Sequence, residues 1–114
     1  MIKRRSEMTT RVVENVRGGN GSVRFLDFLR PDETYGKMRV CSESTLEKGC
    51  SIGRHPHDPD AEIYIILSGK GVVDDNGTIT TVSAGDVVYT GNGEFHALAN
   101  EEDEPLKFIA VVIN

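Results

Sequence analysis

Short apolar segments separated by turn-forming residues run through most of the chain. They are rich in β-branched and aromatic residues, a composition that favours strands over helices. The segments that we interpret as strands are residues 23–28, 38–46, 62–67, 71–73, 78–82, 86–90, 95–99 and 106–113. Their spacing is typical of a sandwich or barrel. We therefore expect an all-β fold.

The turn residues favour an antiparallel arrangement. Asn76-Gly77, between two strand candidates, readily supplies the two positive φ values of a type I′ hairpin turn. Helical periodicity is confined to TTRVVENV, residues 9–16. The tract RGGNG, residues 17–21, is the strongest break and separates an N-terminal lead-in arm (1–21) from a single domain (22–114). These features predict an antiparallel barrel or jelly roll.

Length and charge narrow the class of protein. The 114 residues suffice for one compact domain but not for two. The net charge is −5, yet residues 1–40 hold nine Lys and Arg against five Asp and Glu. An acidic body repels phosphate backbones, so we expect no nucleic-acid partner. The basic cluster Lys3, Arg4 and Arg5 is interpreted as a solvated terminus.

The sequence has no membrane-spanning segment, no signal peptide and no disulfide pattern, which bears on the location of the protein and the state of its cysteines. No apolar run approaches the roughly 18 residues of a membrane span, and the polar start MIKRRSEMTT has no signal-peptide core. We expect a soluble cytoplasmic protein with no membrane partner. Cys41 and Cys50 form neither a CxxC pair nor a disulfide framework. We interpret both as small buried core residues.

The three histidines form the strongest candidate site. His55 and His57 alternate along an extended segment, so both imidazoles face one side and can converge on one metal ion. A short turn can return the carboxylate of Glu62 to this pair, and His96 completes three nitrogens and one oxygen. Such a set leaves open positions on an octahedral ion. An HxH pair alone is common on exposed strands, so the surrounding spacing matters.

That spacing resembles the two conserved motifs of the cupin superfamily. In residues 49–69, Gly49, His55, His57, Glu62 and Gly69 match the first motif, and in residues 85–100, Gly85, Gly93, His96 and Asn100 match the second. Nine of ten motif positions agree, and the exception is Gly91, where the family usually carries Pro. The resemblance implies a cupin double-stranded β-helix. It also implies one divalent metal ion per chain, Mn or Fe being favoured over Zn, Ni or Co, with His55, His57, Glu62 and His96 as ligands.

Strand parity suggests further residues beside the metal. If Glu62 faces inward, Tyr64 does too, and its hydroxyl could donate to an oxyanion on the metal. If His96 faces inward, so does Glu94, which could act as a general acid or base. Arg39 could neutralise an anionic ligand. Both faces of residues 62–67 are mostly apolar, which, with the common dimerisation of small cupins, predicts a homodimer.

The resemblance leaves several functions open. An oxalate-decarboxylase-like protein would hold a small carboxylate, keto acid or sugar acid on the metal and stabilise developing charge. Two-domain oxalate decarboxylases carry a substrate-binding Arg where this chain has Ile52, and the neighbouring Arg54 points away from the metal on a regular strand. Dioxygenase or sugar isomerase chemistry uses the same ligands. The alternative class is a non-catalytic module that binds or senses a small ligand.

Overall fold

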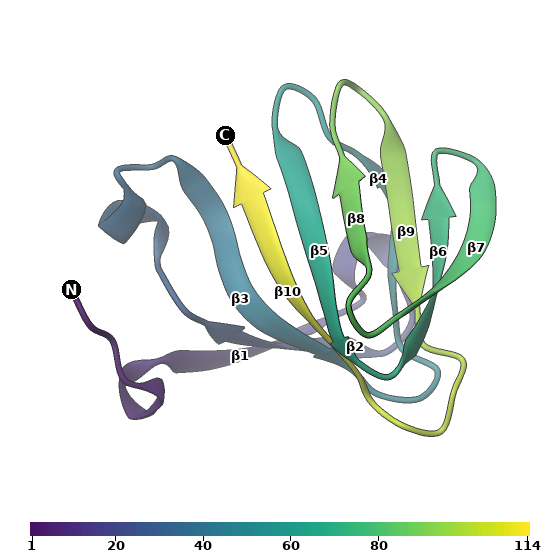
Figure 1. Cartoon of the computed structure of the whole chain (residues 1–114), viewed down its shortest axis with the longest axis horizontal. Helices are drawn as coiled ribbons and strands as arrows, with labels where there is room; N and C mark the ends of the chain where they lie inside the picture. The colour runs from purple at the N-terminus through teal and green to yellow at the C-terminus, as the bar shows by residue number, and fades with distance from the viewer.

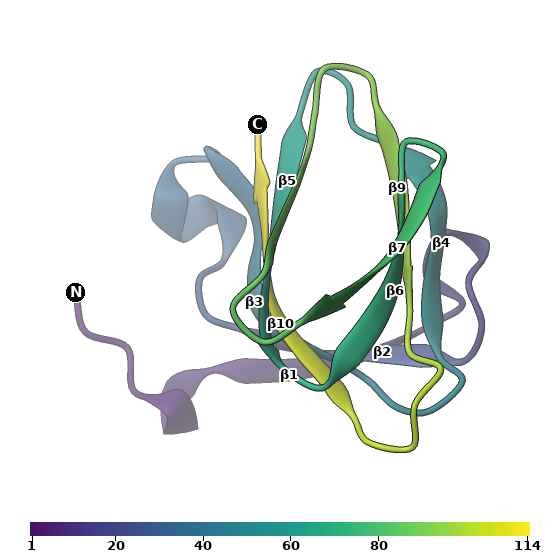
Figure 2. The ribbon, with the colours of Figure 1, turned by 45° about the vertical axis from the view of Figure 1, so that its right-hand side comes forward.

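The computed structural model describes the whole chain, residues 1–114, as two β-sheets that face each other across a common core (Figures 1 and 2). The strands are β1 (Thr9–Glu14), β2 (Ser22–Asp27), β3 (Met38–Leu46), β4 (Ser51–Pro56), β5 (Ala61–Ser68), β6 (Lys70–Asp75), β7 (Thr78–Ser83), β8 (Val87–Thr90), β9 (Phe95–Ala99) and β10 (Leu106–Ile113). Every pairing is antiparallel. The all-β antiparallel prediction is confirmed.

Strands distant in sequence are neighbours in both sheets. The six-stranded sheet has the order β1-β2-β3-β10-β5-β8, and the four-stranded sheet has the order β4-β9-β6-β7. The C-terminal β10 therefore lies between β3 and β5, and β9 lies between β4 and β6. This interleaved order is that of a jelly-roll barrel and not of a simple meander. It places β4 and β9 side by side in one sheet, with β5 in the other.

The predicted hairpin at Asn76-Gly77 is confirmed. β6 and β7 pair with Asp75 opposite Thr78, which leaves a two-residue loop. The φ angles of the two loop residues are 48° and 100°, both in the left-handed region that a type I′ turn requires. The Gly77 N–H also donates to the Asp74 carboxylate at 2.9 Å. Local turn chemistry is thus sufficient to explain this connection.

The helical interpretation of residues 9–16 is wrong. Thr9–Glu14 form the edge strand β1, which pairs along its whole length with β2. All six residues of β1 are exposed, so the valine spacing marks no buried stripe. Backbone pairing with an existing strand outweighs such a weak local pattern, because tertiary context routinely overrides propensity. The predicted lead-in therefore contributes a strand to the sheet.

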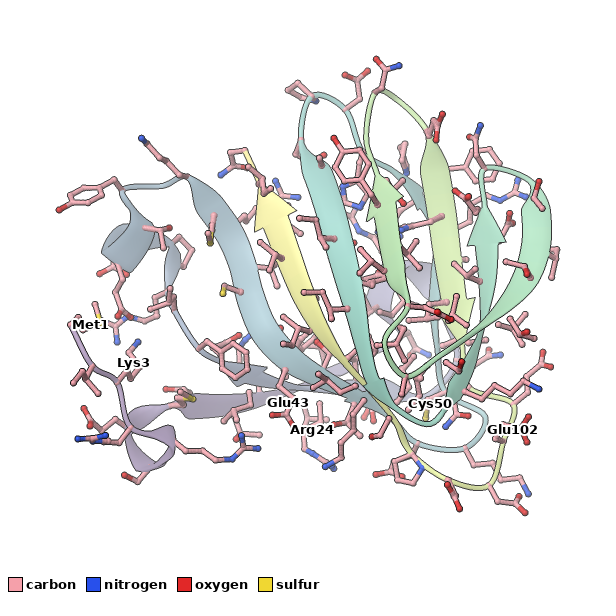
Figure 3. All side chains as sticks on the ribbon, viewed as in Figure 1. Met1, Lys3, Arg24, Glu43, Cys50 and Glu102 are labelled. Atoms are coloured by element: carbon pink, nitrogen blue, oxygen red, sulfur yellow. The ribbon has the colours of Figure 1, made fainter.

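Residues 1–8 project from the barrel but are joined to it by ion pairs. They include the short 3₁₀ helix η1 (Arg5–Glu7). Lys3 Nζ lies 2.5 Å from Glu33, in the 3₁₀ helix η3 (Pro31–Thr34), and Arg5 lies 3.0 Å from Glu43 of β3. Figure 3 shows Met1 and Lys3 at the projecting end. The basic terminus is thus partly neutralised by the body of the protein.

The core lies between the inward faces of the two sheets. Burial alternates along β5 and β10, so Glu62, Tyr64 and Ile66 share the inner face of β5, as parity predicts. The other large buried side chains come mainly from aliphatic residues and Phe108. Cys41 and Cys50 are free and only half-buried, not fully buried as expected. No helix of the structure is long and apolar enough to cross a membrane.

Candidate metal centre

His55 and His57 point into the barrel from the end of β4. Both side chains are buried, whereas Arg54, which precedes His55, and Pro56, which lies between the two histidines, are exposed. Alternate residues of an extended chain face one side, which explains why the two imidazoles lie together. Arg54 faces outward, where it pairs with Asp74 at 3.0 Å, as the sequence predicts. The strand therefore separates the potential metal ligands from the surface side chains.

The strand pairing brings the other two residues to this pair. His96 lies on β9 directly opposite His55, and their Nε2 atoms are 3.0 Å apart. Glu62 is an inward-facing residue of β5, in the other sheet. The segment after His57 crosses from one sheet to the other and returns the carboxylate to the imidazoles. The four residues are thus gathered from both sheets into one buried cluster.

The potential ligand atoms surround a single point. Glu62 Oε1 lies 2.9 Å from the Nε2 atom of His96, 3.1 Å from that of His57 and 3.6 Å from that of His55. Ligands bound at about 2.1 Å and at right angles to one another are about 3 Å apart. The observed spacing therefore fits one ion. Three imidazole nitrogens and a carboxylate suit a divalent transition metal and leave positions free for a small ligand.

Hydrogen bonds on the far side of each ring orient the imidazoles. The Nδ1–H of His55 donates to the carbonyl oxygen of Gly53 at 2.8 Å, and that of His57 donates to the Asp60 carboxylate at 3.0 Å. The Thr90 hydroxyl lies 2.8 Å from Nδ1 of His96 and can accept in the same way. Protons on Nδ1 leave lone pairs on the three Nε2 atoms. These lone pairs and the Glu62 carboxylate are then free to bind a cation, whereas an Nε2 atom that carries a proton instead donates to Glu62.

Burial and neighbouring charge set the ionisation of the cluster. Burial raises the pKa of Glu62, but hydrogen bonds from the three imidazoles outweigh it and hold that pKa well below its usual range. Burial lowers the pKa of His96. The hydrogen bond to Glu62 raises the pKa of His57 against the effect of burial. At neutral pH the centre therefore offers an ionised carboxylate and at least one neutral imidazole.

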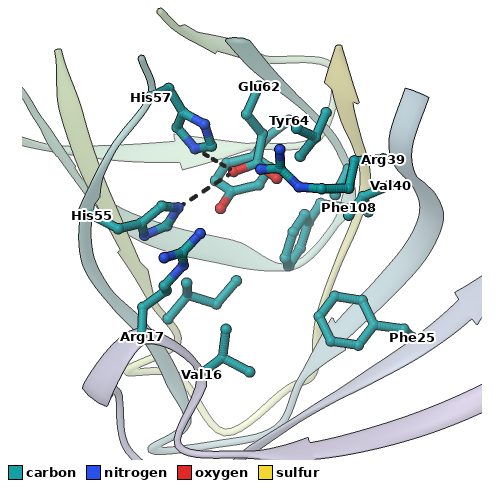
Figure 4. Close-up of a pocket in the computed structure, with 13 residues that line it drawn as sticks. Val16, Arg17, Phe25, Arg39, Val40, His55, His57, Glu62, Tyr64 and Phe108 are labelled. Carbon is teal, nitrogen blue, oxygen red and sulfur yellow. Dashed lines mark hydrogen bonds and ion pairs between the residues drawn. The ribbon is translucent and has the colours of Figure 1, made fainter. Parts of the chain in front are cut away.

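A cavity of about 130 Å³ opens on one side of the cluster (Figure 4). His55, His57 and Glu62 line it, whereas His96 is fully buried behind them. The remaining walls are mostly apolar, with two arginines among them: Val16, Arg17, Phe25, Arg39, Val40, Ile52, Tyr64, Phe108, Ala110 and Val112. The open side of the centre thus faces a small apolar chamber that carries positive charge.

Tyr64 forms the inner wall of this chamber, as the sequence predicts. Its ring stacks on that of His96, with centroids 4.8 Å apart and planes 6° from parallel. Its hydroxyl lies 3.4 Å from Nε2 of His96 and beside Glu62. Burial raises the pKa of Tyr64 well above its usual value. The phenol therefore stays protonated and can donate a hydrogen bond from this position.

Glu94 does not join the cluster, and the expectation that it faces inward is wrong. It precedes β9 in a turn, where its side chain is exposed and absent from the cavity wall. Its backbone carbonyl accepts the His57 N–H at 3.0 Å. Alternation fails here because the extended conformation begins only at Phe95. A catalytic role for the Glu94 side chain remains a prediction.

Three residues near the centre escaped the sequence reasoning. Asp60, between His57 and Glu62, accepts from His57 and also from Arg39 at 2.5 Å. Thr90 contacts His96, and Arg17 lines the cavity. A polar residue on the same strand as a potential ligand can be recognised by its alternate spacing. None of these three residues lies on the strand of the histidine near it, so alternation could not identify them. Arg39, in contrast, lines the cavity as anticipated.

The fold and the site together define a class: an antiparallel two-sheet β-barrel with a buried candidate metal centre of three histidines and one carboxylate. The model of the cupin domain family matches residues 42–112, which hold all four residues of the cluster. The chain belongs to the cupin family.

Known relatives agree with this assignment. The chain is 40% identical over 113 residues to an oxalate-binding protein of Thermotoga maritima, covering 99% of this chain and 93% of the relative. A crystal structure from the same organism, described as a predicted oxalate decarboxylase, superimposes with a TM-score of 0.92 at 40% identity over 99% of this chain and 98% of that one. The polyketide cyclase RemF of Streptomyces resistomycificus shares the fold, with a TM-score of 0.77 at 19% identity over 99% of this chain and 80% of that one.

Proposed function

We propose that this protein binds one divalent metal ion through His55, His57, Glu62 and His96 and holds a small carboxylate on it. The observation that carries the proposal is the convergence of four potential ligand atoms, all within 4.8 Å of one another, beside a cavity with two guanidinium groups. Mixed nitrogen and oxygen ligands favour Mn(II) or Fe(II), with Zn, Ni and Co also compatible. The name of the Thermotoga maritima relative supports a small anionic ligand.

The chain's own residues prepare the site for this ligand. A bound divalent ion would act as a Lewis acid toward a carboxylate oxygen. The apolar side chains of Ile52, Phe108 and Val112 exclude water and strengthen electrostatic contacts in the cavity. Tyr64 can donate its hydroxyl proton to a ligand oxygen or to Glu62. The cavity thus combines one metal-bound position, one neutral donor and flanking positive charge.

Non-catalytic binding is the second candidate, and one observation favours it. Apart from the three cluster residues that line it, the only polar side chains on the cavity wall are the two arginines and Tyr64. Arginine does not deprotonate in proteins, and burial raises the Tyr64 pKa. A decarboxylase, dioxygenase or isomerase reaction would therefore depend on the metal and on Tyr64.

One experiment separates these functions. The purified protein is assayed for metal content, for oxalate, acetate and pyruvate binding by calorimetry, and for product formation with Mn or Fe. We expect close to one divalent ion per chain and metal-dependent carboxylate binding. Product that disappears in Tyr64→Phe supports an enzyme, whereas binding without product supports a binding module. A folded protein that takes up no metal would overturn the proposal.

Two variants define the contributions of individual residues. His57→Ala should lose the metal while circular dichroism confirms the β fold. Glu94→Gln tests the remaining prediction from the sequence: loss of turnover with metal retained would make Glu94 the acid or base. Unchanged turnover would assign Glu94 to the surface turn in which it lies.

We also infer that the protein forms a homodimer through the outer face of the six-stranded sheet. Two rows of cross-strand neighbours lie on this face, and apolar side chains dominate both: Tyr89, Ile63, Val111 and Cys41 in one, and Val87, Ile65, Ile109 and Glu43 in the other. Tyr89 and Val87 are more than 60% exposed in the single chain. Contiguous apolar surface of this kind marks protein interfaces.

Sedimentation velocity tests the dimer. The wild-type chain should sediment as a dimer at micromolar concentration, and Ile65→Glu should sediment as a monomer because it places a charge at the centre of the face. The control Ile79→Glu alters an exposed residue of β7 in the other sheet and should remain dimeric. A monomeric wild type would contradict the inference.

A further inference from the structure

Arg17 presents an unpaired guanidinium group to the metal centre. It lies in the 3₁₀ helix η2 (Val16–Gly18), between β1 and β2, and its side chain extends toward His55 at the cavity wall (Figure 4). No carboxylate lies within ion-pair distance of it. The other cavity arginine, Arg39, is bound to Asp60 and to Asn114. Arg17 is thus the free positive charge of the cavity.

The backbone holds Arg17 in this place at a conformational cost. Its φ is 53°, in the left-handed region that residues other than Gly, Asn and Asp rarely adopt. The loop packs on β4 so closely that a Cβ on Gly53 would lie 2.1 Å from the Arg17 carbonyl oxygen. Surrounding structure that maintains such strain commonly serves a functional site. Here it fixes Arg17 beside the open side of the cluster.

The charges around the cavity define the ligand that would neutralise it. Glu62 and Asp60 contribute two negative charges, and Arg17 and Arg39 contribute two positive ones. These four protein charges therefore balance. A divalent ion would add two positive charges, and no further carboxylate of the site neutralises them. Both arginines are partly exposed to solvent, so the imbalance is moderate, but it still favours a ligand of opposite charge. A ligand with two negative charges balances the loaded centre, whereas a monocarboxylate leaves one positive charge over.

We propose that Arg17 binds the second carboxylate of a short dicarboxylate whose first carboxylate is on the metal, and so selects dianions over monocarboxylates. This inference rests on the proposed function and names its substrate class. A guanidinium group matches a carboxylate with two parallel hydrogen bonds. The cavity of about 130 Å³ favours the shortest members of the class. Arg17 is thus a specificity-determining residue contributed by the N-terminal segment.

Calorimetry on the Mn-loaded protein tests this role. Oxalate and malonate are the dianionic probes, and acetate and pyruvate are the monoanionic ones. In Arg17→Gln the affinity for oxalate should fall about tenfold or more, because a charged hydrogen-bond partner is removed. The affinity for acetate should change much less. Arg17→Lys should recover part of the loss because the charge is kept. The control Arg24→Gln removes an exposed arginine of β2 that pairs with Glu47 and should change neither ligand.

The outcomes distinguish this inference from the proposed function. Wild-type protein that binds no metal, or no carboxylate when loaded, would overturn the proposed function itself. Wild-type protein that binds both ligand types, with an Arg17→Gln variant that weakens them equally or not at all, would overturn only the role of Arg17. Metal content of each variant is measured first, so that a loss of metal is not mistaken for a loss of anion recognition.

Discussion

At each histidine the chain determines which ring nitrogen faces the cluster. His57 is oriented by two successive hydrogen bonds, because its acceptor Asp60 itself accepts from Arg39 of β3. A carboxylate behind an imidazole fixes the tautomer and increases the basicity of the opposite nitrogen. Burial raises the pKa of Asp60, but hydrogen bonds from Arg39 and His57 bring it below its usual value. Asp60 therefore remains ionised and supports His57 at neutral pH.

Removing this support should weaken metal binding. Asp60→Ala leaves the Nδ1–H of His57 without its acceptor and should reduce metal affinity by about 10- to 100-fold. Competition with a chromophoric chelator measures the change. Asp58→Ala is the matched control, since Asp58 lies in the same turn but is exposed and has no bond to a histidine. Equal affinities for the two variants would mean that Asp60 does not orient the ligand.

Acid should release the metal in the range where imidazoles titrate. The hydrogen bond to Glu62 raises the pKa of His57, so a proton competes with the metal at a pH above the ordinary histidine value of about 6.5. The apparent metal affinity is thus highest above this range and falls as the pH drops through it. Glu62 stays ionised throughout, because its pKa is held well below its usual range. Elemental analysis after dialysis at successive pH values tests this, and release only below pH 4 would contradict it.

The sequence could predict ligand residues but not their supports. Alternation along β4 and β5 correctly places His55, His57, Glu62 and Tyr64 on inner faces, because a strand has a fixed period of two. Asp60 and Arg17 act from turns, where no period applies. Their positions depend on contacts with residues far along the chain, such as Arg39 for Asp60 and Gly53 for Arg17.

At the scale of elements, the loop between β1 and β2 is shaped by its contact with β4. Two glycines make this contact, and a Cβ on Gly19 would lie 2.1 Å from the Ser51 carbonyl oxygen. The tract RGGNG therefore packs the N-terminal segment against the strand of His55. The Ser51 N–H donates to the Asn20 carbonyl at 2.9 Å and adds a direct bond between them.

A methyl group at this contact should displace the loop. Gly19→Ala is expected to lower the thermal midpoint and to weaken oxalate binding, because Arg17 moves with the loop while the metal ligands stay. Gly18→Ala is the matched control: its φ of 80° imposes left-handed strain of about 1 kcal/mol, but a Cβ there meets no atom within 4 Å. Differential scanning calorimetry and ligand titration of both variants test this. Equal effects would show that strain, and not the close contact, is what matters.

Elements also show where sequence patterns mislead. Most strands of the barrel body were predictable because each combines β-branched residues with flanking turn residues. β4, whose only β-branched residue is Ile52, was anticipated only as the extended segment of His55 and His57. β1 was not, since its valines mimic helical spacing and none of its side chains is buried. A strand that is held by backbone pairing at a sheet edge leaves little trace in side-chain chemistry.

At the scale of the whole molecule, charge is distributed unequally around the cavity. The protein carries a net charge of −5, yet its first 40 residues hold nine of its 13 Lys and Arg. Arg17 and Arg39 come from this part, whereas Arg11 and Arg30 of the neighbouring cavity are paired with Asp27 and Asp32 and add little net charge. A local positive field can attract anions even to a protein that is acidic overall.

Salt should therefore slow the association of a dianionic ligand. Between about 10 mM and 1 M NaCl the screening length falls from about 30 Å to about 3 Å, which removes the attraction of the surrounding arginines. Stopped-flow measurements with the Mn-loaded protein should show the association rate of oxalate falling severalfold, and that of acetate falling less. A rate that rises with salt would mean that the net negative charge dominates.

The buried position of His96 has a consequence for the order of assembly. Of the cavities in the structure, only the one beside His55, His57 and Glu62 reaches the cluster, so ion and ligand share one entrance. The ion must enter first, and a carboxylate then closes the route by which it came. Protein with both metal and carboxylate bound should therefore lose its metal to a chelator more slowly than protein with metal alone. The carboxylate would then slow the dissociation of the ion to which it is bound.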